Sequence, residues 1–340
     1  MYRDFADCLQ KYFEDYLIKE CGASKNTIRS YRDVFISLID FISDIEKVEP
    51  QKITMDTMDK EFILRYLHWL EKDRKCSLQT RNHRLACMRS FFSYMMYLDP
   101  VHMGQWKGVC TIKRKKCESG KINYLTSEAV ILLLKVIDTS GLKGLRDLTL
   151  ISLLYNSGVR VQELIDLTPG SLRLSAPYVL TVCGKGTKTR TIPLDEPIVN
   201  LVLKYMHEYK LDVPNKEQHP LFFNVWHNKL TPAGVTHIIN KYFIMAKANN
   251  PSIFPEKISP HSFRHSRAMH LVQSGVNLIY IRDILGHVSI KTTEIYARID
   301  SKPKRTALEN AYSSIGIKEP EVKMWSENNK LKEILKNYVH

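Results

Sequence analysis

The spacing of apolar residues follows the period of an α-helix along most of this chain and changes clearly to the period of a β-strand once. From Ile28 to Ile42, apolar side chains recur at steps of three, four, three and four residues, the pattern of an amphipathic helix. Residues 178–183 instead alternate, and a turn at 184–188 leads into a second alternating run at 189–194. We therefore predict a mainly α-helical chain with a small antiparallel β-sheet.

Residues 1–103 carry the apolar stripes of four or five helices, so we expect an N-terminal helical bundle there. Ser24 and Ser77 each precede a stripe and are predicted N-caps, because a serine hydroxyl accepts a hydrogen bond from a free backbone N–H of the first turn. The helical period stops over residues 104–123, which are rich in lysine and arginine. This segment is predicted to be an extended basic linker.

A second, C-terminal domain is predicted over residues 124–321, followed by a terminal helix at 322–340. Residues 145–155 are apolar nearly all round, which indicates a buried central helix. The terminal helix has an apolar face with no obvious place in its own core, so we expect it to dock onto a neighbouring protomer. Packing within the same chain is the alternative. The apolar face consists of Leu331, Ile334, Leu335 and Tyr338.

The chain is strongly basic, with 50 Lys and Arg against 36 Asp and Glu, a net charge of +14. An excess of this size favours an acidic polymer as the partner, most often nucleic acid. Basic residues concentrate at two helix starts and in the linker, where they are suited to phosphate contacts. For any one of them, a solvated helix face is an equally good interpretation. The predicted DNA-contact residues are Lys25, Arg29, Arg32, Arg81, Arg84, Arg89, Lys113, Arg114, Lys115 and Lys116.

Seven cysteines are scattered along the chain, and no two have the CxxC spacing of a zinc site. They are typical of reduced thiols in a cytoplasmic protein. The first residues do not resemble a signal peptide, and no run of about 18 apolar residues predicts a membrane span. We expect neither a metal site nor a membrane anchor.

Four residues near the C-terminal end have side chains suited to chemistry on a phosphodiester. His261 and Arg264 lie one helical turn apart, His287 follows a Leu-Gly pair, and Tyr296 comes nine residues later. A tyrosine hydroxyl can be a nucleophile, and cationic and neutral donors can stabilise a pentacoordinate phosphorus. Taken singly, a tyrosine or a histidine is more often a packing residue. The ordered set therefore carries the hypothesis.

Three residues upstream supply parts that this chemistry lacks. Arg160 begins a helix just after Gly158, where free backbone N–H groups also favour a phosphate, and Glu163 lies one turn on and can pair with it. Lys185 stands between two glycines on the hairpin turn, where a lysine can protonate a leaving oxygen. From the local sequence alone, Arg160 and Glu163 could equally form an ordinary salt bridge within a helix, and Lys185 could belong to an ordinary turn.

The motifs GVRVQEL, GKGTKTR, HSFRH and LGHVSIKTTEIY together resemble the tyrosine recombinase (phage integrase) family, and its Xer-like and transposon-borne members most closely. The resemblance covers residues 124–312. The N-terminal part is similar to the family's SAM-like core-binding domain only in size and helical character. One departure is small: Ser266-Arg267-Ala268-Met269 stands where the family often has Thr-Phe-Ala-Thr.

The resemblance implies a catalytic domain with six active-site residues and one supporting residue. Arg160 and Arg264 correspond to the arginines that bind the scissile phosphate, with Glu163 supporting them. His261 and His287 correspond to histidines that hydrogen-bond the phosphate and assist proton transfer. The remaining two correspond to the general acid, Lys185, and the nucleophile that forms a 3′-phosphotyrosyl link, Tyr296.

The function implied is site-specific DNA recombination through a Holliday junction, in transposition or in integration and excision of a mobile element. No cofactor is implied, because the covalent intermediate conserves the phosphodiester energy. The implied partners are double-stranded DNA and further copies of the chain, as a dimer on one site and a tetramer in the synaptic complex, acting on the bacterial nucleoid. The first helix starts almost at residue 1, which favours a simple Xer-like or transposon layout.

Three alternatives stay open at this point. Xer-type resolution of chromosome or plasmid dimers uses the same chemistry in another biological role. A type IB topoisomerase uses the same set of active-site residues on a single duplex. A non-catalytic DNA-binding protein would share the charge but have no use for the six active-site residues.

Overall fold

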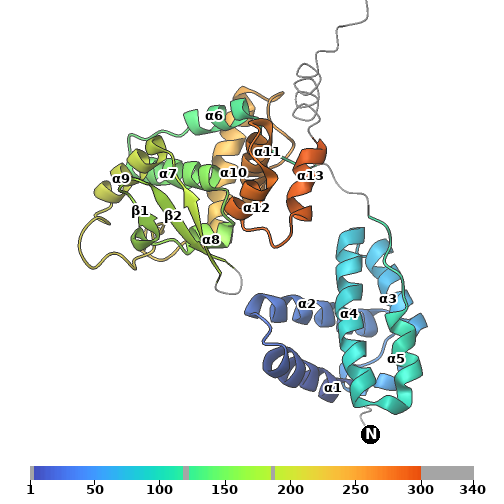
Figure 1. The fold of residues 1–340 in the computed structure, drawn as a ribbon. Coiled ribbons are helices and arrows are strands. Elements are labelled where there is room, and N and C mark those ends of the chain that lie inside the picture. Colours follow the sequence, from blue (N-terminus) through green and yellow to red (C-terminus); the bar gives the residue numbers. More distant parts are fainter. Residues whose placement is uncertain (1–3, 118–121, 185–187, 300–340) are drawn as a thin grey trace, which may run out of the picture. The chain divides into compact units, whose positions relative to one another are not determined.

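The computed structural model describes residues 4–117, 122–184 and 188–299, and it divides the chain into two compact units, residues 1–120 and 121–340 (Figure 1). Helices make up most of both units, and one small antiparallel sheet lies in the second. The predicted fold class is confirmed. No helix within the described ranges is both long and apolar enough to span a bilayer. The C-terminal helix expected at 322–340 and the Lys185 turn lie outside these ranges.

The first unit is a helical bundle whose helices begin where the sequence places capping side chains. Ser24 Oγ accepts from the backbone N–H of Thr27, and Ser77 Oγ from that of Thr80, each at 3.2 Å, so both predicted caps are confirmed. The helices are α1 (Phe5–Lys11), which continues as a π-helical segment (Tyr12–Glu20), α2 (Lys25–Asp44), α3 (Lys60–Lys72), α4 (Leu78–Leu98) and α5 (Met103–Cys110). Short 3₁₀ segments lie at Pro50–Lys52, Met55–Thr57 and Pro100–His102.

Aromatic side chains form the centre of this bundle. The Tyr12 ring meets Phe91 edge-on at a centroid distance of 5.2 Å, and Phe35 meets Phe91 at the same distance. Such edge-to-face pairs add about 1 kcal/mol each beyond the burial of their surface. The buried Tyr12 hydroxyl is paired with Ser90 Oγ at 2.8 Å. The first unit therefore has a complete core of its own.

The predicted linker is wrong in its first half, because helix α5 occupies residues 103–110 and packs on the bundle. Trp106 and Val109 are buried, and the Trp106 ring stacks on Phe92 at 5.5 Å. The backbone that follows is also held, since Asn82 donates to the carbonyl oxygen of Lys115 at 2.7 Å. The helix was not predicted because it has few apolar residues and contains Gly104 and Gly108, which are unfavourable inside a helix.

The second unit packs helices around a central one, α7. Its sheet has the order β1-β2-β3, and the predicted hairpin is confirmed with Leu180 opposite Ile192 and Val182 opposite Arg190. The helices are α6 (Ser127–Lys135), α7 (Leu142–Ser157), α8 (Val161–Ile165), α9 (Glu196–Glu208), α10 (Pro232–Asn249), α11 (Pro260–Gln273), α12 (Leu278–Leu285) and α13 (Lys291–Ile299). The strands are β1 (Leu172–Arg173), β2 (Val179–Cys183) and β3 (Thr189–Pro193), with a 3₁₀ turn at Pro169–Ser171.

Helix α7 is buried along nearly its whole length, as its apolar sequence predicts. Two buried charged residues on its first turns, Arg146 and Asp147, pair with each other at 2.7 Å. Tyr242 on α10 donates to the same carboxylate at 2.9 Å, and Arg146 donates to the carbonyl oxygen of Phe223 at 3.1 Å. A buried ion pair is tolerated when its remaining groups are hydrogen-bonded in this way.

A smaller apolar cluster joins α11, α12 and α13. It consists of Ala268, Met269, Val272, Ile281, Leu285 and Tyr296. Because Tyr296 belongs to this cluster, the packing of three helices determines where its hydroxyl lies.

Candidate active site

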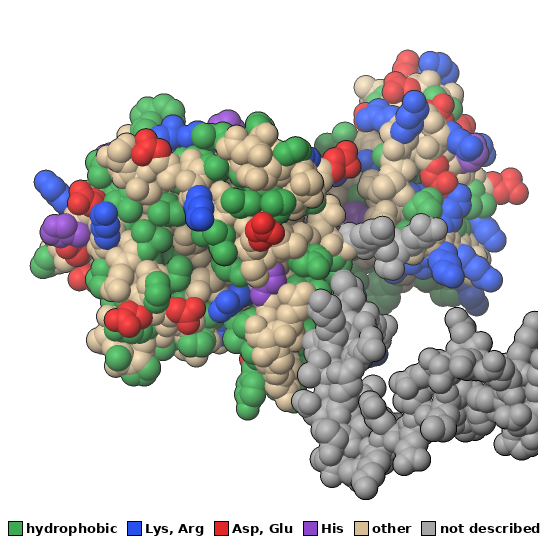
Figure 2. All heavy atoms as spheres, turned by 90° about the horizontal axis from the view of Figure 1, so that it is seen from above, with side chains coloured by type: hydrophobic (Ala, Val, Ile, Leu, Met, Phe, Trp, Pro, Cys, Tyr) green, Lys and Arg blue, Asp and Glu red, His purple; other side chains and the backbone are tan. Residues whose placement is uncertain are grey.

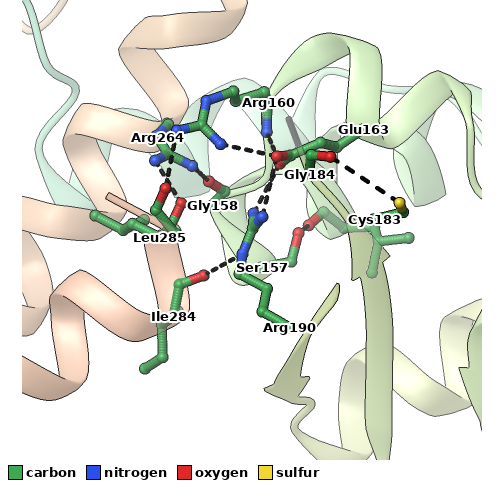
Figure 3. Close-up of polar contacts among 12 residues, drawn as sticks. Ser157, Gly158, Arg160, Glu163, Cys183, Gly184, Arg190, Arg264, Ile284 and Leu285 are labelled. Atoms are coloured by element: carbon green, nitrogen blue, oxygen red, sulfur yellow. Dashed lines mark hydrogen bonds and ion pairs between the residues drawn. The ribbon is translucent and has the colours of Figure 1, made fainter. Parts of the chain in front are cut away.

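The turn between α7 and α8 positions Arg160 and Glu163. Gly158 ends α7 with a φ of +61°, a conformation that favours glycine, and Arg160 is then the N-cap residue of α8. Glu163 accepts from the backbone N–H of Arg160 and from its Nη1, each at 2.8 Å. Arg160 Nη2 donates to the carbonyl oxygen of Gly286 at 3.0 Å. The pairing suggested by their spacing is present (Figure 3).

Arg190 on β3 is a member of this group that the sequence analysis did not select. Its two Nη atoms donate to the Glu163 oxygens at 3.0 and 2.7 Å, and its Nε donates to the carbonyl oxygen of Ile284 at 2.9 Å (Figure 3). A signal was available in the alternation of the strand. Arg190 shares the inward face with Ile192, where a charged residue needs a buried partner.

Glu163 is ionised and held by both arginines. Burial would raise the pKa of its carboxyl, but the hydrogen bonds and charges of Arg190 and Arg160 outweigh burial and lower the pKa to about 2. The carboxylate is therefore ionised at neutral pH.

Arg264 is buried with 4% of its surface exposed, and two carbonyl oxygens hold it. Its Nη1 donates to the carbonyl oxygen of Gly158 at 2.7 Å, and its Nη2 to that of Leu285 at 2.5 Å (Figure 3). Burial, followed by the charge of Arg160, lowers its pKa to about 10, so it remains a cation at neutral pH. The Arg264 guanidinium is thus hydrogen-bonded both to the residue that ends α7 and to the last residue of α12.

The histidines near these arginines are uncharged at neutral pH. His287 Nδ1 lies 2.9 Å from the Thr293 hydroxyl, and burial with the charges of Arg264 and Arg160 lowers its pKa to about 4. His261 on the first turn of α11 also has a lowered pKa, through partial loss of solvent and the same two arginines. Neutral imidazoles can each donate one hydrogen bond and accept another.

Tyr296 on α13 lies against His287 and His265. Its ring is stacked on His287 with centroids 6.4 Å apart, and its hydroxyl oxygen lies 2.8 Å from His265 Nδ1. Only 1% of Tyr296 is exposed, and this burial raises its pKa, although the charge of Arg264 acts in the opposite direction.

His265 is a second member of this group that the sequence analysis did not select, since it lies about 100° around the helix from Arg264. The overlooked signal was the spacing of four from His261, which puts both imidazoles on one face of α11. Their ring centroids are 6.5 Å apart.

Segments distant in sequence thus bring five of the seven predicted residues into one connected group, and His261 lies close enough for its pKa to be affected by Arg160 and Arg264. The seventh, Lys185, lies outside the described residues, but the described Gly184 borders the group. A side-chain carbon at Gly184 would lie 3.7 Å from Glu163 Oε1. Among the described residues, no cluster of His, Cys, Asp and Glu side chains has the arrangement of a metal site.

Comparison with known proteins agrees with this arrangement. The sequence profile of the phage integrase family matches residues 123–302, and that of the phage integrase N-terminal SAM-like domain matches residues 10–97. The chain belongs to the phage integrase family. This confirms the family to which the motifs pointed, and with it a tyrosine-type site-specific recombinase.

Relatives of this integrase-family chain include the tyrosine recombinase XerD of Listeria monocytogenes, 32% identical over 292 residues, which cover 84% of this chain and 92% of XerD. Two solved structures share the fold. One is the XerH site-specific recombinase bound to palindromic difH substrate, with a TM-score of 0.64 and 23% identity over 91% of this chain and 87% of that one. The other is the Tn1549 transposon integrase with transposon right end DNA, with a TM-score of 0.70 and 16% identity over 89% of this chain and 98% of that one.

Not all of the predicted DNA-contact residues of this recombinase are exposed. Arg81 is only 3% exposed, is paired with Glu71 at 3.1 Å and donates to the carbonyl oxygen of Lys113 at 3.3 Å. The prediction of a phosphate contact at Arg81 is wrong, because the same charge serves to hold the chain after α5. Lys115 also pairs with Glu71, at 2.6 Å, while remaining exposed.

The other candidates divide into residues with protein partners and residues at the surface. Arg84 donates to Ser37 Oγ at 2.7 Å, Arg89 donates to the carbonyl oxygen of Ile112, and Arg32 pairs with Asp33 at 2.7 Å. On the face shown in Figure 2, Lys and Arg side chains are numerous over the first unit and are interspersed with Asp and Glu. The exposed candidates that remain are Lys25, Arg29, Lys113, Arg114 and Lys116.

Proposed function

We propose that this tyrosine recombinase cleaves and rejoins DNA strands through a 3′-phosphotyrosyl intermediate and a Holliday junction. The observation that carries the proposal is the convergence of Arg160, Arg264, His287 and Tyr296 from four separate segments, in a chain whose family is known. An ordinary structural role explains each of these residues singly but gives no reason for two arginines, a neutral imidazole and a tyrosine to meet.

In the cleavage step, Arg160 and Arg264 bind the scissile phosphate and offset the negative charge that develops on its oxygens. The Tyr296 oxygen attacks phosphorus, its proton passes to a neighbouring imidazole, and the bond from phosphorus to the 5′-oxygen breaks. Lys185 supplies the proton that the departing 5′-oxygen needs. In the rejoining step, the free 5′-hydroxyl of a second strand attacks phosphorus and gives its proton to Lys185, while the bond to the Tyr296 oxygen breaks and this oxygen takes back the proton from the imidazolium.

Tyr296 cannot attack from its present position, because its ring is covered and its hydroxyl is paired with His265. Helix α13 therefore has to shift before cleavage. Neutral His261 and His287 suit the phosphate pocket, since each can donate to a phosphate oxygen without adding to the repulsion between the two arginines.

The partners we propose are double-stranded DNA and other copies of the chain, as a dimer on one site and a tetramer when two sites meet. XerH and the Tn1549 integrase are both in complex with DNA in their solved structures, which supports this choice. Residues 124–321 would be the catalytic domain, and residues 322–340 would pass between protomers. The site of action would be nucleoid DNA in the cytoplasm.

The biological role we favour is transposition, or integration and excision, of a mobile element. Resolution of chromosome or plasmid dimers is the second candidate, and the observation that supports this second role is the 32% identity to XerD. Mapping covalent cleavage sites on the genomic DNA that flanks the gene would distinguish them. Sites at the two ends of a mobile element support the first role, and a single chromosomal site supports the second.

The decisive test of the chemistry is a nicked duplex that traps the covalent adduct, used with duplexes tiled across the flanking DNA. The wild-type chain should become linked to the 3′ end of the cut strand. Tyr296→Phe should bind the same duplex and form no adduct. Adduct formation by Tyr296→Phe would exclude Tyr296 as nucleophile, and binding without any wild-type adduct would indicate a non-catalytic DNA-binding protein. Resolution of a synthetic Holliday junction distinguishes a recombinase from a type IB topoisomerase.

A further inference from the structure

Arg190 lies on an inward position of strand β3, where a charged side chain is costly unless it is paired. We propose that Arg190 is a positioning residue, which holds Arg160 in place through Glu163 and fastens the β2-β3 hairpin to the other active-site segments. This inference rests on the proposed function, in which Arg160 binds the scissile phosphate.

The first step in the argument is that Glu163 has no spare hydrogen-bonding capacity. Its two oxygens accept four hydrogen bonds, two from the Nη atoms of Arg190, one from the backbone N–H of Arg160 and one from Arg160 Nη1. A carboxylate has about four lone-pair directions, so the arrangement is saturated. Arg190 therefore fixes one side of the carboxylate, and the other side fixes the Arg160 guanidinium.

The second step concerns Gly286, which both arginines contact. Gly286 has a φ of +65°, and a side-chain carbon there would lie 2.9 Å from Arg190 Nη1 and 3.0 Å from its Cζ. Arg160 Nη2 donates to the carbonyl oxygen of the same glycine, and Arg190 Nε donates to that of Ile284. Glycine at 286 thus leaves the space through which Arg190 reaches the end of α12.

One side chain consequently ties together three segments that carry active-site residues. The hairpin carries Lys185, the turn before α8 carries Arg160, and the residue after Gly286 is His287. Arg190 has hydrogen bonds to Glu163 and to the end of α12, and its own strand belongs to the hairpin. A change at Arg190 should therefore misplace the phosphate-binding arginine instead of weakening DNA binding in general.

The charges around Glu163 allow the proposal to be tested through the pH dependence of cleavage. Arg190 from β3 and Arg160 from the turn before α8 contact it, and the charge of Arg264 on α11 also interacts with it. His287 lies near Arg160, Arg190 and Arg264, and it is already neutral. Removing Arg190 would take away the strongest of the effects that lower the pKa of Glu163, while burial would continue to raise it. Protonation of Glu163 would then release Arg160.

The experiment measures the rate of covalent adduct formation on the nicked duplex from about pH 5 to about pH 9, together with DNA affinity and thermal unfolding. Arg190→Met should cleave on the order of 100-fold more slowly with little change in affinity, because a displacement of about 1 Å at a reacting group has that effect. Its rate should also fall more steeply toward acid pH than the wild-type rate does, and this additional acid dependence comes from Glu163. In Arg190→Met combined with Glu163→Gln, that acid dependence should disappear, since the titrating group is gone.

Arg190→Lys and Arg173→Met complete the set. Arg190→Lys keeps the positive charge but lacks the planar guanidinium. Its cleavage rate should therefore lie between those of the wild type and Arg190→Met, and it should retain some of the additional acid dependence. It also decides the matter if Arg190→Met does not fold. Arg173 is exposed on β1 of the same sheet, and within the described part of the chain its side chain donates to the carbonyl oxygen of Pro177, so Arg173→Met should behave as wild type. A wild-type rate and pH profile in Arg190→Lys, and in Arg190→Met if it folds, would overturn the role of Arg190. Absence of an adduct with the wild type would instead overturn the proposed function.

Discussion

The hydroxyl oxygen of Tyr296 lies 2.8 Å from Nδ1 of His265, in a pocket that leaves 1% of the tyrosine exposed. Burial, followed by electrostatic interaction with His261 and with the charged Arg264, lowers the pKa of His265, so its imidazole is neutral at pH 7 and Nδ1 can accept from the hydroxyl. This hydrogen bond and the apolar cluster around the ring hold α13 against α11 and α12.

His265→Ala should therefore loosen α13. A buried hydroxyl left without a partner costs about 1 kcal/mol, which corresponds to about a fivefold rise in opening. Amide hydrogen exchange over residues 291–299 would measure it. Tyr296→Phe removes the same hydrogen bond and should give a comparable rise, and the double variant should add little. Unchanged exchange in both single variants would mean that packing alone holds the helix.

Lys185→Ala should slow cleavage by about 100-fold or more, because the 5′-oxygen would leave without a proton donor. A duplex with a 5′-bridging phosphorothioate has a leaving group that needs no proton, and it should restore the rate of the variant. The exposed Lys188, at the base of the same hairpin, provides the matched control, and Lys188→Ala should cleave both duplexes as the wild type does. If the phosphorothioate fails to rescue Lys185→Ala, the lysine is not the acid.

Arg29 and Arg81 should respond differently to substitution although both were predicted DNA contacts. Arg29 is exposed on α2, so Arg29→Ala should weaken DNA binding and reduce the salt dependence by about one phosphate contact. Arg81 is buried against Glu71, so Arg81→Ala should lower the free energy of unfolding by about 3 kcal/mol. Urea unfolding and DNA titrations at several salt concentrations separate the two. A stable Arg81→Ala protein with weakened, less salt-dependent binding would restore Arg81 as a phosphate contact.

Glu163 should make stability fall in acid. Its pKa is lowered from an ordinary 4.5 to about 2 in the folded protein, so its stabilisation is complete above pH 4.5 and is lost as the pH falls toward 2. Glu163→Gln should be less stable than wild type by about 3 kcal/mol at neutral pH, and this difference should shrink in acid. Urea unfolding at a series of pH values tests this. A difference that stays constant with pH would show that the charge of Glu163 is not what stabilises the fold.

Local regularities of the sequence predicted much of the fold. The apolar stripe of α2, the caps Ser24 and Ser77 and the alternation of the hairpin each depend on a few neighbouring residues, and all three are present. The short helix α5 was missed because a stripe of only Trp106 and Val109, interrupted by Gly108, is too short to show a period.

The site was harder to predict where a side chain's partner is distant in sequence. Spacing gave the Arg160–Glu163 pairing, since both residues lie on one helical turn. It could not give Arg190 with Ile284, His265 with Tyr296 or Arg81 with Glu71, because these contacts depend on how separate elements pack. Charge alone also selected Arg81 as a DNA contact, although this arginine is buried against Glu71.

Arg264 is hydrogen-bonded to the carbonyl oxygens of two residues that are far apart in sequence, so the site can form only after both have been synthesised. Gly158 and Leu285 lie on opposite sides of a long stretch of chain, and contacts across such a separation form late in folding. A nascent chain that has emerged only as far as α10 contains α7 and the hairpin. It does not yet contain Arg264, Leu285 or Tyr296. Under the proposed mechanism, strand cleavage therefore becomes possible only after α11, α12 and α13 have been synthesised, and a polypeptide released at α10 would lack the proposed nucleophile.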